Sequence, residues 1–129
     1  MSKSELAVEL KHAGCNCCQA VLCAFAEEAA LPEETLRRLG AGFGAGMGGM
    51  EGTCGALVAA EMLLGLVKYR GAPVMGDARK LHQAFVQACG ASLCKDLKGR
   101  DTGKPLCSCD DCVRHAAELA EKVLLTDGE

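Results

Sequence analysis

The chain has few aromatic residues and few prolines. Its 129 residues include no tryptophan, one tyrosine, three phenylalanines and three prolines. Sheets are enriched in aromatic and β-branched residues, whereas Ala, Leu and Met favour helices. No segment of useful length alternates between apolar and polar residues. The composition therefore predicts an all-α fold with a core of small aliphatic side chains.

A long apolar run and a cluster of basic residues are also missing. The longest apolar run, residues 56–67, is interrupted by Glu61 and is shorter than the roughly 20 residues that a membrane-spanning helix needs. The formal net charge is -3, and the basic residues are scattered rather than gathered into a stripe that binds phosphates. No secretory signal is visible at the N-terminus. We therefore expect a soluble, cytoplasmic protein that binds neither nucleic acid nor a membrane.

Cysteine is the residue type that the chain has in excess. Ten cysteines in 129 residues are compatible with a disulfide framework, with metal ligation or with catalytic thiols. A disulfide framework normally compensates for a core too small to hold a chain folded. Because half of the residues are hydrophobic, this chain has ample material for a core, and structural disulfides are disfavoured.

Helical periodicity and helix-ending residues predict one all-α domain over residues 1–129, with five or six helices. The expected helices cover residues 4–13, 16–30, 32–39, 54–69, 77–89 and 109–125, with a polar surface loop at residues 95–104. Residues 40–55 contain eight glycines, too many for a stable helix. We expect this segment to form an irregular loop whose backbone approaches another group closely.

Four cysteines lie at or near predicted helix starts. Asn16, Thr53 and Ser108 are good helix-capping residues directly before Cys17, Cys54 and Cys109, and Ser92 stands two residues before Cys94. The positive end of a helix dipole favours the thiolate, which is the form that binds metal or attacks a disulfide. Four helix starts meeting at one point would provide the four cysteine ligands that an iron–sulfur cluster needs.

The sequence resembles a known family, the redox-active proteins named for their C, GCAxxG, C, C cysteine pattern. These proteins are related to the cluster-binding part of split-Soret cytochromes. The resemblance spans about residues 14–124, with Ala59 in place of the last glycine of the motif. The stretches that carry it are Asn16-Cys17-Cys18-Gln19-Ala20-Val21-Leu22, Gly42 to Gly48 followed by Cys54-Gly55-Ala56-Leu57, Ser92 to Leu97, and Cys109 to Val113 with Ala116 to Leu119.

This resemblance implies a redox protein whose four family cysteines are Cys17, Cys54, Cys94 and Cys109. The cytochrome relatives imply an iron–sulfur cluster, here expected to be [2Fe-2S], in electron transfer or redox sensing. The expected partner is a redox protein, a homodimer is compatible with the sequence, and no catalytic residues are predicted. Cys107 and Cys112 remain alternatives to Cys109 as the fourth ligand.

Two other functions remain open. In a thiol/disulfide oxidoreductase, Cys17 or Cys15 would attack a disulfide and Cys18 would resolve the mixed intermediate. A structural zinc or other metal-binding module would use the two C-x-x-C pairs, Cys15 with Cys18 and Cys109 with Cys112. Cys23 and Cys89 lie on apolar helical faces, where a cysteine behaves as a small buried hydrophobe, and both are assigned to the core.

Overall fold

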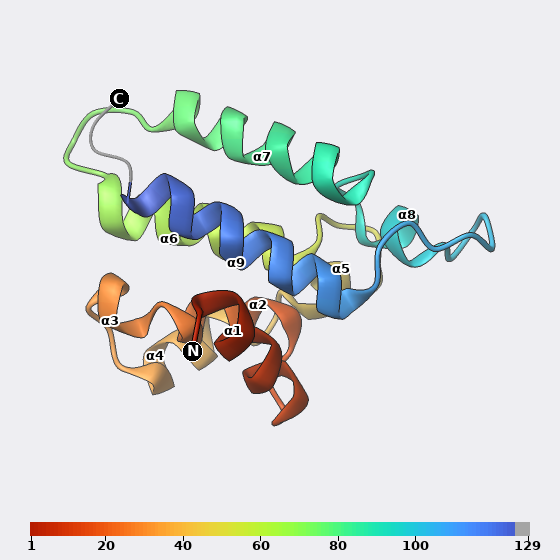
Figure 1. Cartoon of the computed structure of the whole chain (residues 1–129), viewed down its shortest axis with the longest axis horizontal. Coiled ribbons are helices and arrows are strands. Elements are labelled where there is room, and N and C mark those ends of the chain that lie inside the picture. The colour runs from red at the N-terminus through yellow and green to blue at the C-terminus, as the bar shows by residue number, and fades with distance from the viewer. Residues whose placement is uncertain (126–129) are drawn as a thin grey trace.

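A computed structural model describes residues 1–125 of the protein, and residues 126–129 of the predicted domain lie outside the described residues. The described chain is mostly helical (Figure 1). No strand forms within residues 1–125, where one isolated antiparallel bridge joins Thr53 to Leu93. The elements are α1 (Lys3–His12), α2 (Cys17–Ala24), α3 (Ala26–Ala29), α4 (Glu33–Gly40), α5 (Gly44–Met47), α6 (Gly55–Lys68), α7 (Met75–Cys89), α8 (Cys94–Lys98) and α9 (Cys109–Leu125).

The all-α prediction is confirmed, but the predicted number of five or six helices was too low. The expected helix over residues 16–30 is divided at Phe25 into α2 and α3. The expected loop at residues 95–104 begins instead within a short helix, α8, whose Leu97 is buried. The segment α5 is an irregular turn because Ala45 and Gly46 adopt left-handed conformations, so eight regular helices remain over residues 1–125.

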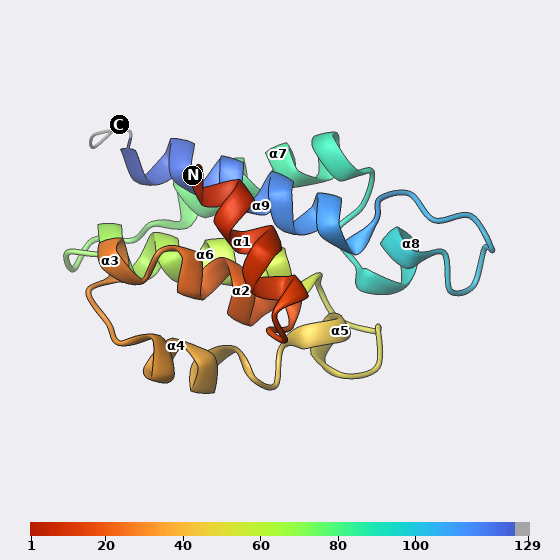
Figure 2. The same cartoon turned by 60° about the horizontal axis from the view of Figure 1, so that its bottom comes forward.

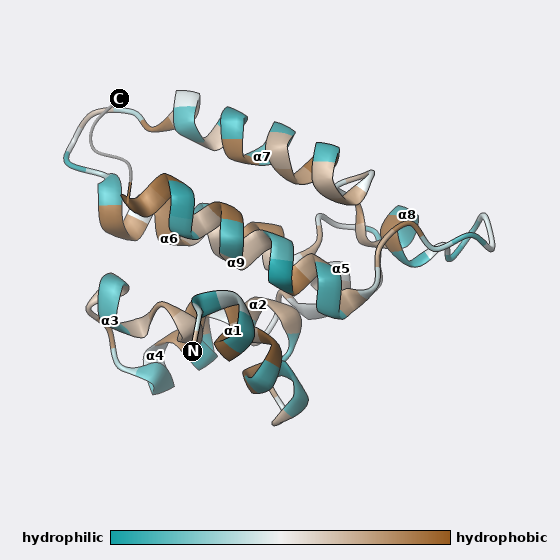
Figure 3. Cartoon of the chain, in the orientation of Figure 1, coloured by the Kyte–Doolittle hydropathy of each residue, from teal (hydrophilic) through white to brown (hydrophobic). Residues whose placement is uncertain are grey.

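Helix α6 forms the centre of the protein and packs against α2, α7 and α9. Figure 3 shows that α6 is largely apolar, whereas α4 and α7 carry hydrophilic residues on their outer sides. Small side chains such as Ala56, Ala59 and Ala60 are buried along α6 and let the neighbouring helices approach closely. Leu57 and Leu63 fill the remaining space. The core is therefore built from small aliphatic residues, as the shortage of aromatic residues predicts.

The helix ends that carry most of the cysteines lie at one end of the molecule. Helices α6 and α9 begin at the same end, where α7 terminates and where α5 and α8 are found (Figures 1 and 2). Cys54 directly precedes α6, Cys109 begins α9 and Cys89 ends α7. The fold thus gathers cysteines from distant parts of the sequence. Among the helices described for residues 1–125, none combines the length and the apolar character that a bilayer-spanning segment requires.

Candidate metal centre

Cys17 is fixed in the first turn of α2 by a complete capping box. The Asn16 side chain accepts a hydrogen bond from the Gln19 backbone N–H at 2.8 Å, and the Gln19 side chain accepts one from the Asn16 backbone N–H at 2.9 Å. The Asn16 amide also donates to the carbonyl oxygen of Gly40 at 3.1 Å. The predicted helix start before Cys17 is confirmed, and the same cap ties α2 to the beginning of the glycine-rich segment.

Cys54 and Cys94 are brought together by the isolated bridge between Thr53 and Leu93. The Cys54 N–H donates to the Ser92 carbonyl at 2.8 Å, and the Cys94 N–H donates to the Gly52 carbonyl at 3.0 Å. Thr53 was expected to cap α6, but it lies in this bridge, and Cys54 occupies the N-cap position without a capping hydrogen bond from its side chain. Cys94 is the first residue of α8. Both cysteines thus lie at helix starts, although neither is preceded by the cap that its sequence suggests.

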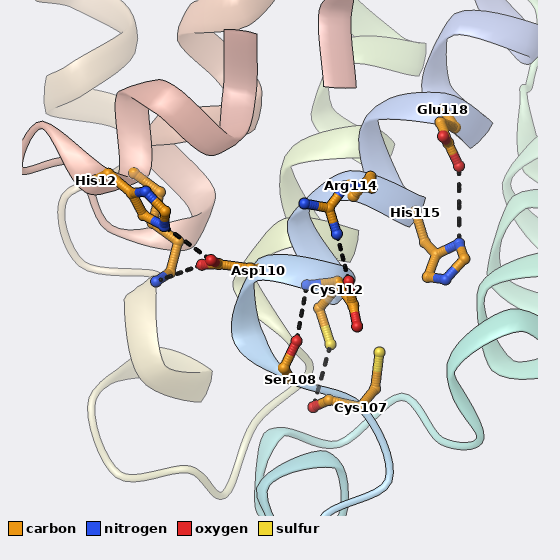
Figure 4. Close-up of polar contacts among 10 residues, drawn as sticks. His12, Cys107, Ser108, Asp110, Cys112, Arg114, His115 and Glu118 are labelled. Carbon is orange, nitrogen blue, oxygen red and sulfur yellow. Dashed lines mark hydrogen bonds and ion pairs between the residues drawn. The ribbon is translucent and has the colours of Figure 1, made fainter. Parts of the chain in front are cut away.

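Cys109 begins α9, and the residues on either side of it fix its position. The Ser108 hydroxyl accepts a hydrogen bond from the Asp111 N–H at 3.1 Å, so the predicted cap is present. The Asp110 carboxylate lies 2.7 Å from His12 Nε2 and 3.0 Å from Lys11 Nζ (Figure 4). These contacts join the last turn of α1 to the first turn of α9 and bring Lys11 close enough to Cys109 to act on it electrostatically.

The glycine-rich segment makes the close approach that its composition predicts. A Cβ atom on Gly46 would lie 2.5 Å from Cβ of Cys94, and one on Gly55 would lie 2.6 Å from Sγ of Cys17. Gly46 also has a φ of 59°, which side-chain-bearing residues rarely adopt. Glycine is therefore required at both positions, because the backbone passes directly against two of the predicted cysteine ligands.

Cys17 connects two of the other predicted ligands through its side chain, but no three of the four, all of which lie within the described residues 1–125, have Sγ atoms that all lie within 4.8 Å of one another. Cys17 interacts with both Cys54 and Cys109, and Cys54 interacts in turn with Cys112. Cys94 lies against Gly46, and negative charge on Cys109 acts to raise the pKa of Cys94. Cys17, Cys54 and Cys94 are buried, and Cys109 is half-buried. Chain segments separated by up to about ninety residues thus converge on one cysteine-lined region.

The thiols of this region bind their protons more tightly than an isolated cysteine does. The Cys112 thiol, more than burial, raises the pKa of Cys54 to about 12, despite an opposing contribution from Cys17. Cys109 lowers the pKa of Cys17, but Cys54 and burial outweigh it and the pKa is raised. The pKa of Cys109 is raised chiefly by Cys17. The expected activation at helix starts is therefore wrong for the metal-free protein, because burial and neighbouring thiols outweigh the helix dipole.

Positive charges and backbone N–H groups partly oppose this effect. Lys98 and Lys11 act to lower the pKa of Cys109, and Lys98 and Arg100 act in the same direction on Cys94. The backbone N–H of Ala45, in the glycine-rich segment, stabilises the thiolate of Cys17. The backbone N–H of Ala56, in the first turn of α6, does so for Cys54. These groups thus offset part of the cost of negative charge on the sulfurs.

The metal-free protein should become less stable in alkaline solution. Burial raises the pKa of Cys18 from about 9 to about 12, so the folded state keeps a proton that the unfolded state loses. This stabilisation is complete below pH 9 and is lost as the pH rises towards 12, with a slope of at most about 1.4 kcal/mol per pH unit. Urea unfolding of metal-free protein at several pH values checks this, and the slope between pH 9 and 11 should be smaller in Cys18→Ala. Equal slopes in both proteins would contradict it.

The structure also brings together three cysteines that the sequence did not group. The Sγ atoms of Cys89, Cys107 and Cys112 all lie within 4.8 Å of one another, which is suitable for binding a metal ion. Cys89 is buried in the hydrophobic core, as predicted, and its Sγ also belongs to this group. The spacing of the three cysteines contains no motif that would have identified them, since the group depends on α7 ending beside the start of α9.

The two cysteines of each predicted C-x-x-C pair interact with other thiols rather than with each other. Cys15 interacts with Cys23, and Cys109 and Cys112 interact with different thiols. All ten cysteines are free, which agrees with the expectation that disulfides do not hold this fold together. The observed neighbours give no support to a zinc site formed from these two pairs.

Residues 15–123, a segment that contains every cysteine, match the family model described as "Putative redox-active protein (C_GCAxxG_C_C)". The chain belongs to this family. Family membership supports redox activity, and the group of Cys89, Cys107 and Cys112 has a geometry that could hold a metal ion. No curated protein and no solved structure matches the chain.

Proposed function

We propose that this member of the family binds an iron–sulfur cluster through Cys17, Cys54, Cys94 and Cys109. The proposed cluster is [2Fe-2S], and the proposed function is transfer of single electrons to and from a protein partner, or redox sensing. The observation that carries the proposal is the interaction of Cys17 with both Cys54 and Cys109 beside a glycine-lined backbone. Four thiolates are the ligand set that such a cluster requires.

The donor set of the region fits this group. The side chains that converge there are thiols, which are soft ligands suited to iron–sulfur clusters. Gly46 and Gly55 leave no room for a Cβ atom, so the backbone can approach sulfur closely. Cluster sulfides accept hydrogen bonds from such backbone N–H groups, and these bonds tune the reduction potential. When bound, the cluster would supply a reversible one-electron carrier.

The residues around the four cysteines would hold charge and exclude water. Burial of Cys17, Cys54 and Cys94 limits the access of water to the sulfurs. Lys11 and Lys98 supply positive charge on the side of Cys109. Arg100 donates to the Gly49 carbonyl at 3.0 Å and pairs with Glu51 at 2.9 Å, which fastens the 99–104 loop to the glycine-rich segment. These contacts hold the two loops together.

The thiol/disulfide alternative is less well supported. Its proposed attacking residues, Cys15 and Cys17, are only 6% and 7% exposed, and the resolving Cys18 is fully buried. The pKa values of Cys17 and Cys18 are raised, so both are protonated at neutral pH and are poor nucleophiles. Metal binding overcomes this obstacle, because a metal ion displaces thiol protons as it binds.

Removal of a nearby positive charge should lower the reduction potential of the centre. Lys98 acts electrostatically on both Cys94 and Cys109, and a positive charge favours the more negative, reduced state. We expect Lys98→Met to shift the potential downward by on the order of tens of millivolts, since a half-buried charge is partly screened. Lys104→Met, an exposed change of equal charge, is the control. Redox titration followed by visible spectroscopy checks this, and an unchanged or raised potential in Lys98→Met would contradict it.

Purification without oxygen tests the proposal itself. The protein, as isolated or after cluster reconstitution, should absorb visible light and contain iron and acid-labile sulfide in equal amounts. On one-electron reduction it should give an electron paramagnetic resonance signal that accounts for one spin per cluster. A colourless, iron-free product after reconstitution would refute the proposal.

A further inference from the structure

A second group of cysteines lies beside the proposed cluster ligands. It consists of Cys89, Cys107 and Cys112, whose Sγ atoms lie within 4.8 Å of one another. Cys89 and Cys112 are buried, and Cys107 is half-buried. No other set of three or more Cys, His, Asp or Glu ligand atoms is this compact within residues 1–125.

Three different elements build this group. Cys89 is the last residue of α7, which ends because Gly90 has a φ of 101°. The Leu106 side chain lies over Gly90, at 3.4 Å from the position that a Cβ atom would take. The next residue, Cys107, donates its N–H to the Leu97 carbonyl at 3.3 Å. These contacts place Cys107 beside the end of α7.

The third cysteine comes from the first turn of α9. Figure 4 shows Cys107 and Cys112 next to one another, with Sγ of Cys112 directed to the Cys107 carbonyl at 3.9 Å. The Cys112 N–H donates to the Ser108 carbonyl at 2.9 Å, so the helix itself fixes Cys112. The three sulfurs are therefore held by backbone hydrogen bonds and packing, without any disulfide.

The thiol of Cys112 is affected mainly by other cysteines and by burial. The groups that act most strongly on Cys112 are Cys54, Cys89, burial and Cys107, none of which is cationic. Cys89 ends a fifteen-residue helix, whose C-terminal carbonyls carry partial negative charge and favour a cation. Thiolate ligands select soft cations over hard ones such as magnesium or calcium.

We propose that Cys89, Cys107 and Cys112 form a second metal site that binds one soft, thiophilic cation, zinc or copper(I). On binding, each thiol releases its proton to solvent and forms one metal–sulfur bond, with no change of oxidation state. Such an ion would join α7, the 99–108 loop and α9 next to the four-cysteine region. This site uses none of the four proposed cluster ligands, although its Cys112 interacts with Cys54.

The test uses the full chain with one cluster ligand removed. In metal-free Cys17→Ser, the three-cysteine group is intact because Cys17 interacts with Cys54 and Cys109 rather than with its members. Zinc and copper(I) are titrated separately against chelators of known affinity. We expect one ion per chain in at least one titration, and affinity at least about tenfold weaker when Cys107→Ser is added. Adding Cys23→Ser instead should leave the affinity unchanged.

Several outcomes would overturn this second site. One is that Cys17→Ser binds neither zinc nor copper(I) at one ion per chain. Another is that binding to Cys17→Ser is unchanged when Cys107→Ser is added. Cys107→Ser in the otherwise unchanged chain separates the two sites, since it should keep its iron and visible absorption. Loss of iron in that variant would make Cys107 a cluster ligand and would also contradict the second site. X-ray absorption at the edge of the bound metal should show three sulfur ligands.

Discussion

Cys54→Ser should lose its iron and its visible absorption, both falling to background. Cys54 interacts with Cys17, and its backbone is bridged to the segment that carries Cys94, so it connects the members of the proposed ligand set. Serine offers a harder oxygen ligand with a much higher pKa, which binds iron–sulfur clusters poorly. Iron and sulfide analysis of protein purified without oxygen measures the effect.

Cys23→Ser provides the matched control for this change. Cys23 is buried, and its thiol donates to the Glu33 carbonyl at 3.8 Å, a role that a serine hydroxyl can keep. Its thiol neighbour is Cys15, not one of the four proposed ligands. We therefore expect iron content close to that of the unchanged protein. Similar losses in the two variants, or full retention in Cys54→Ser, would contradict the proposed ligand set.

Two glycine-to-alanine changes in α6 should have opposite effects on stability. A Cβ on Gly55 would lie 2.5 Å from the Phe43 carbonyl oxygen and 2.6 Å from Sγ of Cys17, so Gly55→Ala should destabilise the protein by roughly 1–3 kcal/mol. A Cβ on Gly65 meets nothing within 4 Å, and Gly65→Ala should stabilise it by up to about 1 kcal/mol. Urea unfolding of the metal-free proteins gives both values.

The two glycine variants should also differ in the amount of cluster that they bind. Gly55→Ala pushes Cys17 away from its neighbours and should reduce the iron bound per chain, whereas Gly65→Ala should not change it. Stability changes of the same sign, or normal iron content in Gly55→Ala, would show that close approach at Gly55 does not shape the centre.

Local sequence signals were sufficient for most of the secondary structure. The capping box at Asn16 and the cap at Ser108 identified the starts of α2 and α9, because these hydrogen bonds form within one turn. Glycine density correctly indicated close backbone approach at Gly46 and Gly55. The short helix α8 escaped prediction because it depends on burial of Leu97 and on the bridge at Leu93, both of which are tertiary.

The chemistry of the cysteines could be predicted only in part. The location of Cys17 and Cys109 at helix starts follows from local sequence, but the pKa values of the cysteines depend on thiols from distant parts of the chain. For Cys54 the dominant contribution comes from Cys112, which is more than fifty residues away. The grouping of Cys89 with Cys107 and Cys112 likewise follows from where α7 ends relative to α9. No spacing rule contains that information.

Anomalous diffraction at the iron absorption edge, from crystals of the iron-loaded protein, tests the central claim most directly. We predict iron at bonding distance from the sulfurs of Cys17, Cys54, Cys94 and Cys109. Iron held by any other set of cysteines, or no ordered iron in protein that carries it in solution, would contradict the account.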